Sequence, residues 1–210
     1  MRPPAALALG LALACLASGC RSGGSGTNAR SSVSTSAAQA PDASGFDGAA
    51  LPAGVPAPAN FTLRDLTSGA HVSLSSYRGR VVIVAFPYST CGATCVVIAQ
   101  QIRGALDELA QPVPVLLISA NPGTDTPARA HSFLTHASLS GRASYLSGTR
   151  PQLRAVWHSF RVVPASAGRA AYDRSASVFV LDRSGHERVI FQLEQLTPEA
   201  LSHDVRKLLD

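Results

Sequence analysis

Residues 81–109 read VVIVAFPYSTCGATCVVIAQQIRGALDEL. The first six form a continuous apolar run rich in β-branched residues, which predicts a strand buried on both faces of a sheet. From Thr94 to Leu109 the apolar residues recur with the 3.6-residue period of a helix. Cys91 and Cys95 stand between the two. In an open α/β sheet, ligands and reactive groups collect at this kind of strand-to-helix corner.

The segments on either side of this unit predict the rest of an α/β domain. Ahead of it, short strands at 61–63 and 72–74 flank a turn at 65–69. After it come a buried strand at 113–119, helices at 126–135 and 151–160, and an irregular stretch at 161–174. Antiparallel strands at 177–181 and 188–193 and an amphipathic helix at 198–209 close the chain, and Trp157 belongs to the core. This order predicts one thioredoxin-like domain, a central mixed sheet flanked by helices, over residues 60–210.

Composition excludes several classes of protein. The 210 residues are 46% hydrophobic and 15% charged, which excludes a wholly disordered chain, a collagen-like repeat and a coiled coil. The net charge is +5, but only Lys207 of the 18 basic residues is a lysine, and the arginines are scattered. Without a basic stripe or an accompanying aromatic cluster, the sequence argues against nucleic-acid binding.

Residues 1–19 have the pattern of a secretory signal. Arg2 precedes an uncharged apolar run that is too short for a membrane span. Small residues lead into Cys20, as in a bacterial lipobox, so we expect a lipid on Cys20; Cys15 is the weaker candidate, and a signal with incidental cysteines is the alternative. The expected location is the outer face of the cytoplasmic membrane, on the periplasmic or cell-envelope side. Residues 20–59, rich in Ser, Gly, Ala and Pro, predict a flexible tether.

The spacing of Cys91 and Cys95 predicts a reactive pair. At a helix N-terminus the macrodipole and the free amides stabilise a thiolate at Cys91 and lower its pKa. Cys95 lies one helical turn further, so both sulfurs face one side. In an oxidising location such a pair is a disulfide, a redox couple or a metal site, and soft thiolates suit Cu(I). A purely structural staple is disfavoured, because so short a loop removes little entropy from the unfolded chain.

Several further stretches share a specific order and spacing with the cysteine segment: Phe61-Thr62-Leu63-Arg64-Asp65 with Gly69, Leu74 through Gly79, Tyr88 through Cys95, Ile118-Ser119-Ala120-Asn121-Pro122, Asp125-Thr126-Pro127, and Val180-Leu181-Asp182-Arg183-Ser184-Gly185. Together they resemble the Sco/SenC family of exported thioredoxin-fold proteins over residues 60–210. In that family a CxxxC motif and a distant His bind one copper. The resemblance implies copper ligation by Cys91 and Cys95. It also implies a role in assembling the binuclear copper site of cytochrome c oxidase, as copper donor, thiol reductant or both. The implied partner is the oxidase subunit that carries this site, or another exported thiol protein.

Three positions depart from the family pattern. The residue that matches the family His is Arg174, Val96 replaces the usual Pro, and Asn121 replaces the usual Asp. A guanidinium offers donors only and cannot be a copper ligand, so Cu(I) is favoured over Cu(II). Two roles for Arg174 stay open: it stabilises a thiolate of the cysteine pair, or it is a solvated loop residue.

Other metal ligands are disfavoured. His158 on the third helix and His186 in the hairpin turn are weak candidates, and the remaining histidines fall on turns or exposed helical faces: His71, His131, His136 and His203. Met1 is the only methionine, which excludes a methionine-rich copper site.

Several functions therefore compete. The first is a copper-binding assembly factor. The second is a thiol–disulfide oxidoreductase in which Cys91 attacks and Cys95 resolves the mixed disulfide. A peroxidase is disfavoured, because a P-x-x-x-T-x-x-C pattern starting at Pro87 would need Thr at 91 and Cys at 94. The intact cysteine pair argues against a non-enzymatic binding module.

Overall fold

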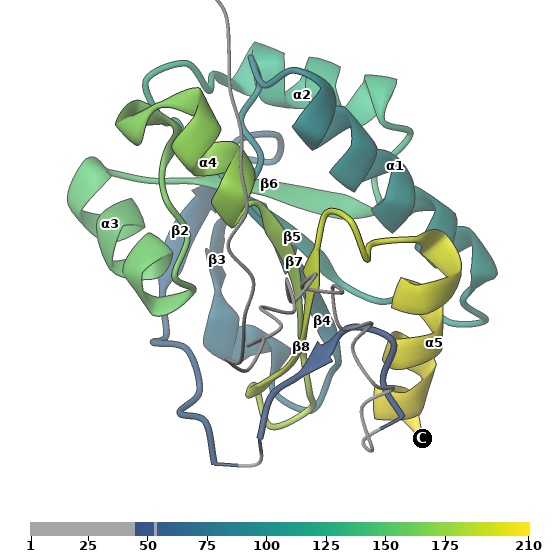
Figure 1. Cartoon of the computed structure of the whole chain (residues 1–210). Helices are drawn as coiled ribbons and strands as arrows, with labels where there is room; N and C mark the ends of the chain where they lie inside the picture. Colours follow the sequence, from purple (N-terminus) through teal and green to yellow (C-terminus); the bar gives the residue numbers. More distant parts are fainter. Residues whose placement is uncertain (1–44, 53) are drawn as a thin grey trace, which may run out of the picture. The chain divides into compact units, whose positions relative to one another are not determined.

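The structure is a computed structural model that describes residues 45–52 and 54–210, all within a unit spanning residues 39–210. Its centre is a mixed eight-stranded sheet in the order β1-β8-β7-β4-β5-β6-β2-β3 (Figure 1). The strands are β1 Ala49–Ala50, β2 Thr62–Asp65, β3 His71–Ser73, β4 Val82–Ala85, β5 Val115–Ile118, β6 Ala143–Ser147, β7 Ser177–Leu181 and β8 Glu187–Gln192.

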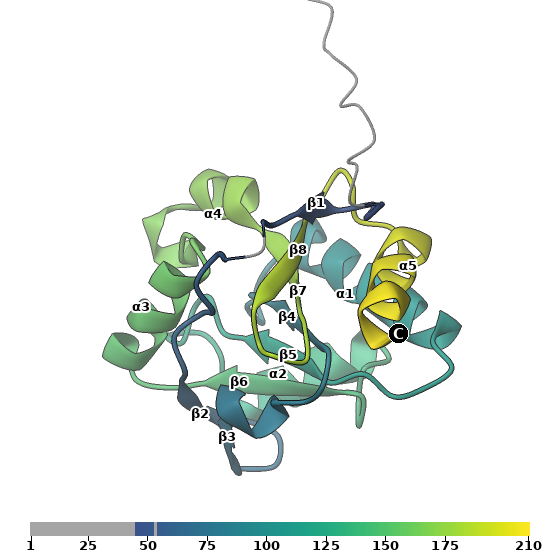
Figure 2. The same cartoon turned by 90° about the horizontal axis from the view of Figure 1, so that it is seen from below.

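Five α-helices and two short 3-10 helices complete the fold of the described residues. The helices are α1 Ala93–Glu108, α2 Pro127–His136, α3 Arg150–Ser159, α4 Arg169–Ser175 and α5 Pro198–Leu209, with 3-10 turns at Leu74–Tyr77 and Ala165–Ala167. Figure 2 shows α1 and α5 on one face of the sheet, and α3 and α4 on the other. Parallel pairs β4–β5 and β5–β6 form its middle, and β7 runs antiparallel to β4. The expected thioredoxin-like α/β architecture is confirmed.

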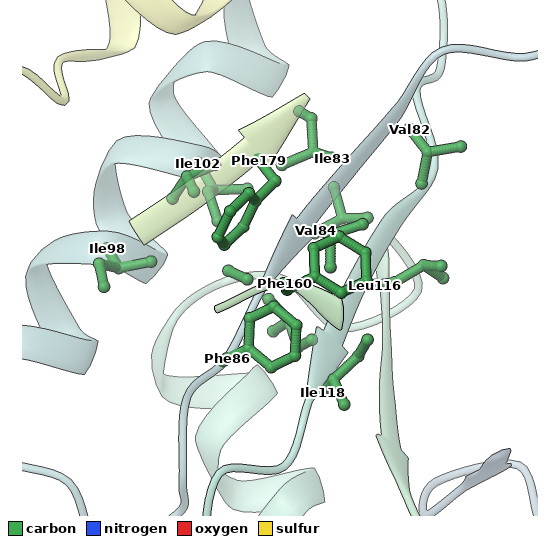
Figure 3. Close-up of a cluster of buried hydrophobic side chains, with 14 of the residues drawn as sticks. Val82, Ile83, Val84, Phe86, Ile98, Ile102, Leu116, Ile118, Phe160 and Phe179 are labelled. Carbon is green, nitrogen blue, oxygen red and sulfur yellow. The ribbon is translucent and has the colours of Figure 1, made fainter. Parts of the chain in front are cut away.

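The core lies against the central strands. All four residues of β4 are buried, as expected for a strand covered on both faces. The rings of Phe86, Phe160 and Phe179 pack against one another with centroids 5.2–5.9 Å apart (Figure 3). Trp157 is 6% exposed and its Nε1–H donates to the Ser119 carbonyl oxygen at 3.0 Å, which confirms it as a core residue. These contacts rigidify the sheet end from which the cysteine segment departs.

Three elements differ from the sequence-based expectations. The irregular stretch expected at 161–174 is wrong in its last part, because α4, Arg169–Ser175, begins within it. Strand β6 was not expected, and it pairs in parallel with β5. Strand β1 falls inside the segment assigned to the tether, and it pairs antiparallel with β8. All three are short or poor in large apolar residues, so the sequence shows little apolar periodicity there. Their stability comes from strand pairing or from packing on the rest of the domain.

The expected signal at 1–19, which contains Cys15, and the expected lipidation site Cys20 lie outside the described residues. Within the described part of the chain, no helix has both the length and the apolar character needed to cross a membrane.

Candidate redox and metal site

The paired cysteines occupy the corner between β4 and α1 and are joined by a disulfide. Gly92 is the N-cap of α1, so Cys91 immediately precedes the helix and Cys95 lies in its first turn. Cys91 is partly exposed, whereas Cys95 is fully buried. The two sulfurs therefore meet at the strand-to-helix corner, with one facing solvent and the other facing the core.

The loop that carries Cys91 is tied down by its own backbone. The Cys91 N–H donates to the Tyr88 carbonyl oxygen at 3.0 Å, which closes a turn directly ahead of the helix. One residue further back, the Pro87 carbonyl oxygen accepts the Ala120 N–H at 2.9 Å, which joins this loop to the end of β5. The position of Cys91 thus follows from the ends of two neighbouring parallel strands.

A buried carboxylate strengthens the same anchorage. Asp125 accepts the Ser89 N–H at 2.6 Å through Oδ1. Its Oδ2 accepts the Ser119 hydroxyl at 2.6 Å and the Tyr145 hydroxyl at 3.0 Å. A buried carboxylate must be compensated by such donors, and here each donor comes from a different segment. Asp125 therefore links the cysteine loop to the ends of β5 and β6.

Helix α4 docks on the cysteine segment from the other side. The Thr94 hydroxyl donates to Asp173 Oδ1 at 2.9 Å, and Tyr172 Oη lies 3.1 Å from Cys95 Sγ. The guanidinium of Arg169 covers Gly92, because a Cβ built on that glycine would lie 3.1 Å from Arg169 Cζ.

Arg169, Tyr172 and Asp173 have the i, i+3, i+4 spacing of one helical face. Sequence reasoning missed all three. A tyrosine in an otherwise small and polar stretch was the available signal.

Tyr172 is fully buried between this helix and the loop after β4. Its hydroxyl donates to the Phe86 carbonyl oxygen at 2.8 Å, and its ring packs edge-on against Tyr88 with centroids 5.0 Å apart. Burial, followed by the neighbouring Tyr88 and Asp173, raises the pKa of Tyr172 well above its usual value. The phenol is therefore protonated at neutral pH.

Arg174 does not share the face of α4 that meets the cysteines. Its side chain is exposed, and no hydrogen bond or ion pair joins it to any other described residue. The arginine that approaches the motif is Arg169, which also lies 3.6 Å from Asp173 through Nε. A thiolate-stabilising role for Arg174 stays a prediction.

No histidine among the described residues contacts the cysteine pair. All six are exposed: His71, His131, His136, His158, His186 and His203. His186 Nδ1 lies 3.8 Å from Asp182, and His203 Nδ1 lies 3.0 Å from Asp204. Among the described residues, the one group of three His, Cys, Asp or Glu side chains whose ligand atoms all lie within 4.8 Å is Asp47, His203 and Asp204.

The donor set at the corner is therefore two sulfurs. Once the disulfide is reduced, Cys91 and Cys95 offer two soft ligands on one side of α1. Soft thiolates select Cu(I), whereas Cu(II) prefers nitrogen and oxygen ligands in a tetragonal arrangement. The residues present fit Cu(I), and the described part of the chain adds no imidazole to them. Val96, where the family pattern has Pro, is 48% exposed beside this pair.

The sheet and the cysteine corner together define a thioredoxin-like protein with a CxxxC site. The model of the SCO1/SenC family matches residues 53–210, and the chain belongs to that family. A comparison with curated protein sequences finds no match.

Several solved structures share this fold. Bradyrhizobium japonicum ScoI with copper bound is 28% identical, with a TM-score of 0.57 over 73% of this chain and 99% of that one. Apo Sco1 from Thermus thermophilus is 24% identical, with a TM-score of 0.60 over 78% and 96%. BsSco, described as a Sco-family cytochrome c oxidase assembly protein with a disulfide switch, is 20% identical, with a TM-score of 0.59 over 72% and 92%.

Proposed function

We propose that this chain is an exported, membrane-tethered Sco protein that binds Cu(I) through Cys91 and Cys95 and exchanges thiols with disulfides. We further propose that it acts in assembly of the copper site of cytochrome c oxidase. Its partner is the subunit carrying that site or another exported thiol protein. The observation that carries the proposal is the cysteine pair at the β4–α1 corner, with one sulfur partly exposed and the other buried.

The asymmetry of the pair supports exchange chemistry. A partner thiolate can reach only a sulfur that is accessible, and Cys91 is the accessible one. Cys95 is buried and close enough to displace the partner from a mixed disulfide at Cys91. The free amides at the start of α1 favour negative charge on the Cys91 sulfur.

Family membership supports the copper half of the proposal. B. japonicum ScoI was solved with copper bound, and BsSco is described as an oxidase assembly protein. In this chain the two sulfurs are soft donors that match Cu(I).

A second function is favoured by the donor set itself. The described residues bring no third His, Cys, Asp or Glu ligand to the two sulfurs, and the family's ligand His corresponds to Arg174 in the resemblance. A thiol–disulfide oxidoreductase that does not retain copper needs no third ligand. It is the alternative that the experiments must separate from copper binding.

The proposal that the protein is exported and tethered to a membrane is based on the sequence of residues 1–20. A lipid on Cys20 would tether the domain to the membrane surface through residues 21–44. Intact mass of the protein purified from membranes tests this directly, because acylation at Cys20 adds lipid and removes residues 1–19. A mature chain of unmodified mass would contradict the lipid anchor.

Copper stoichiometry separates the two functions. The reduced full chain, with Cys15→Ser and Cys20→Ser to remove the other thiols, is titrated anaerobically with Cu(I) against a chelating competitor. We expect about one copper per chain, lost in Cys91→Ser and in Cys95→Ser, because both thiolates are needed. Retained thiol exchange without copper binding would establish the second function instead.

Replacement of Arg174 tests the position of the family ligand. Arg174→His supplies an imidazole at the position that matches the family ligand, and we expect it to create stable Cu(II) binding. Because Arg174 lies off the face of α4 that meets the cysteines, this binding requires α4 to turn the new side chain toward the reduced pair. His158→Ala serves as the control, because that side chain is exposed and distant in sequence from the motif. Unchanged Cu(II) affinity in Arg174→His would contradict the correspondence between Arg174 and the family His.

A further inference from the structure

The buried phenol of Tyr172 contacts the cysteine pair at one sulfur only. Tyr172 Oη lies 3.1 Å from Cys95 Sγ, and both side chains have no exposed surface. Cys91 is partly exposed and its sulfur makes no such contact with the described residues. The two thiols of the reduced pair are therefore placed in different hydrogen-bonding environments.

The single hydroxyl proton of Tyr172 is already committed. It is donated to the Phe86 carbonyl oxygen at 2.8 Å, and a carbonyl oxygen can only accept. Oη is therefore the acceptor toward Cys95. A disulfide sulfur has no proton to donate, so in the oxidised pair the 3.1 Å approach is not a hydrogen bond of this kind. Reduction gives Cys95 an S–H on a sulfur that already lies 3.1 Å from Oη in the disulfide form, within reach of a free lone pair of that oxygen.

We propose that Tyr172 is a positioning residue that favours the dithiol over the disulfide, by accepting a hydrogen bond that only reduced Cys95 can donate. The proposal rests on the thiol–disulfide chemistry proposed above and does not depend on copper. It assigns the two cysteines different roles after reduction. Only Cys95 has Tyr172 Oη as an acceptor, whereas Cys91 is the accessible sulfur and the one that attacks.

The electron and proton balance is that of ordinary exchange. A dithiol partner gives two electrons and two protons to the Cys91–Cys95 disulfide and itself becomes a disulfide. One S–S bond breaks in this chain and one forms in the partner. Each sulfur of the dithiol takes up one of the two protons, and the proton on Cys95 Sγ is the one donated to Tyr172 Oη.

The same hydrogen bond opposes loading with a soft metal. Two thiolate ligands require Cys95 to lose the proton that Tyr172 holds in place. Removing the hydroxyl should therefore have two effects at a fixed neutral pH: it should favour disulfide formation, and it should tighten Cu(I) binding. Loosened packing around the pair would not produce both changes together.

Tyr172→Phe tests the proposal, because it deletes the hydroxyl and keeps the ring. The full chain carrying Cys15→Ser and Cys20→Ser is equilibrated with mixtures of reduced and oxidised glutathione, and the pair is scored by thiol trapping. Loss of one net hydrogen bond should shift the equilibrium about fivefold toward the disulfide. That shift corresponds to a midpoint about 20 mV lower for this two-electron couple.

Tyr88→Phe is the matched control. Tyr88 packs edge-on against Tyr172 and is also buried, at 7% exposed, but its hydroxyl makes no hydrogen bond with the described residues. The equilibrium constant of Tyr88→Phe with glutathione should stay within about twofold of that of the unchanged chain, because no hydrogen bond from an S–H is lost. An equal shift in both variants, or no shift in Tyr172→Phe, would overturn the proposal.

A second measurement decides the question if Tyr172→Phe does not fold. In Cys91→Ser on the same background, Cys95 is the sole thiol, and its S–H stretching band is recorded by Raman spectroscopy. A band below that of a free thiol, as in a hydrogen-bonded S–H, supports the proposal. A band at the free-thiol frequency overturns it.

The outcome for Tyr172 is separable from the proposed function. If the unchanged pair neither exchanges with glutathione nor binds Cu(I), the proposed function fails. If it does exchange and Tyr172→Phe leaves its midpoint where it was, only the role of Tyr172 fails.

Discussion

Two buried aspartates, one at the cysteine corner and one at the far edge of the sheet, use the same chemistry for different ends. Asp125 accepts the Ser89 N–H, and Asp204 accepts the N–H groups of Asp47 and Gly48 at 2.9 Å each. Neither carboxylate has an arginine or lysine partner among the described residues. Each instead holds a segment that is remote in sequence. Ser89 lies 36 residues from Asp125, and Asp47 lies 157 residues from Asp204.

The difference lies in which segment each one holds. Asp125 fixes the loop that leads into Cys91, and it also accepts the hydroxyls of Ser119 and Tyr145. Asp204, on α5, fixes only the residues ahead of β1. A carboxylate that holds backbone amides therefore supports function only where the held segment carries the reacting atoms. Replacing Asp125 should change both the free energy of unfolding and the reactivity of Cys91. Replacing Asp204 should change the free energy of unfolding alone.

The largest effect is expected at Asp125. Asp125→Ala leaves three donors without their acceptor, two of them in buried hydrogen bonds, and should lower the free energy of unfolding by about 3–4 kcal/mol. Released from this anchor, Cys91 should also react faster with iodoacetamide in the reduced protein. Denaturant unfolding and alkylation rates measure the two effects. A stability loss with an unchanged alkylation rate would show that the backbone contacts alone hold the loop.

Asp204→Ala should give a smaller loss without a chemical effect. Two amides and the Nδ1 of His203 lose their acceptor, which should cost about 2–3 kcal/mol. Hydrogen exchange should rise at Ala49 and Ala50, since β1 loses its attachment to α5. His203→Ala is the control, because that imidazole is about half exposed and its removal should cost well under 1 kcal/mol. Altered Cys91 alkylation in Asp204→Ala would break the contrast between the two aspartates.

A third buried carboxylate, that of Glu187, has a cation as its partner in place of amide donors. Glu187 pairs with Arg161, and burial, only partly offset by that arginine, raises the pKa of Glu187 above its ordinary value of 4.5. Below that value both the folded and the unfolded chain are protonated at this residue. As pH rises, the unfolded chain ionises first, so the stability contribution of Glu187 is lost between its unfolded and its raised folded pKa.

Glu187→Gln should therefore remove this part of the decline in unfolding free energy above pH 4.5. The slope removed is at most about 1.4 kcal/mol per pH unit, the value for one proton. Arg161→Met should extend the decline to higher pH, because it removes the charge that opposes the effect of burial. Urea unfolding across this pH range measures both, and parallel curves for Glu187→Gln and the unchanged chain would contradict the assignment.

The smallest effect is expected where α4 meets the start of α1. Thr94→Val keeps the side-chain shape but removes the 2.9 Å hydrogen bond to Asp173, which should cost about 1 kcal/mol. Because Tyr172 is carried on the same helix, the glutathione equilibrium of the cysteine pair should shift in the direction expected for Tyr172→Phe, by a smaller factor. Thr90→Val is the control, because Thr90 is exposed and its hydroxyl bond to Thr124 is 3.4 Å long. A midpoint shift in Thr90→Val but not in Thr94→Val would argue against this coupling.

The sequence predicts the β4–α1 corner well because its signals are continuous and local. An apolar run followed by a helical period leaves little choice of structure, and the observed β4 and α1 differ from the expected 81–86 and 94–109 by one residue at each end. The placement of Cys91 ahead of the helix and of Cys95 in its first turn follows from that boundary. The helix expected at 198–209 agrees with α5 for the same reason.

The surroundings of the pair are not predictable in the same way. Helix α4 has seven residues, of which only Tyr172 is buried, so no apolar period marks it. It follows Gly168, whose positive φ of 107° sets the turn before the helix. The contact between Tyr172 and Cys95 spans 77 residues, and no local pattern encodes it. The sequence therefore draws attention to Arg174, which matches the family ligand position, and gives no signal for Arg169, Tyr172 and Asp173 on the face of α4 that meets the cysteines.

The two outermost strands of the sheet have a consequence for the protein in a crowded environment. β1 has two residues and β3 has three, so each border of an eight-stranded sheet offers few open backbone groups. A short border gives a second chain little template for adding a strand, which is the usual start of edge-to-edge aggregation. At high local concentration, copies of this protein should therefore not aggregate through their sheet edges. The cysteine corner then stays accessible to a partner.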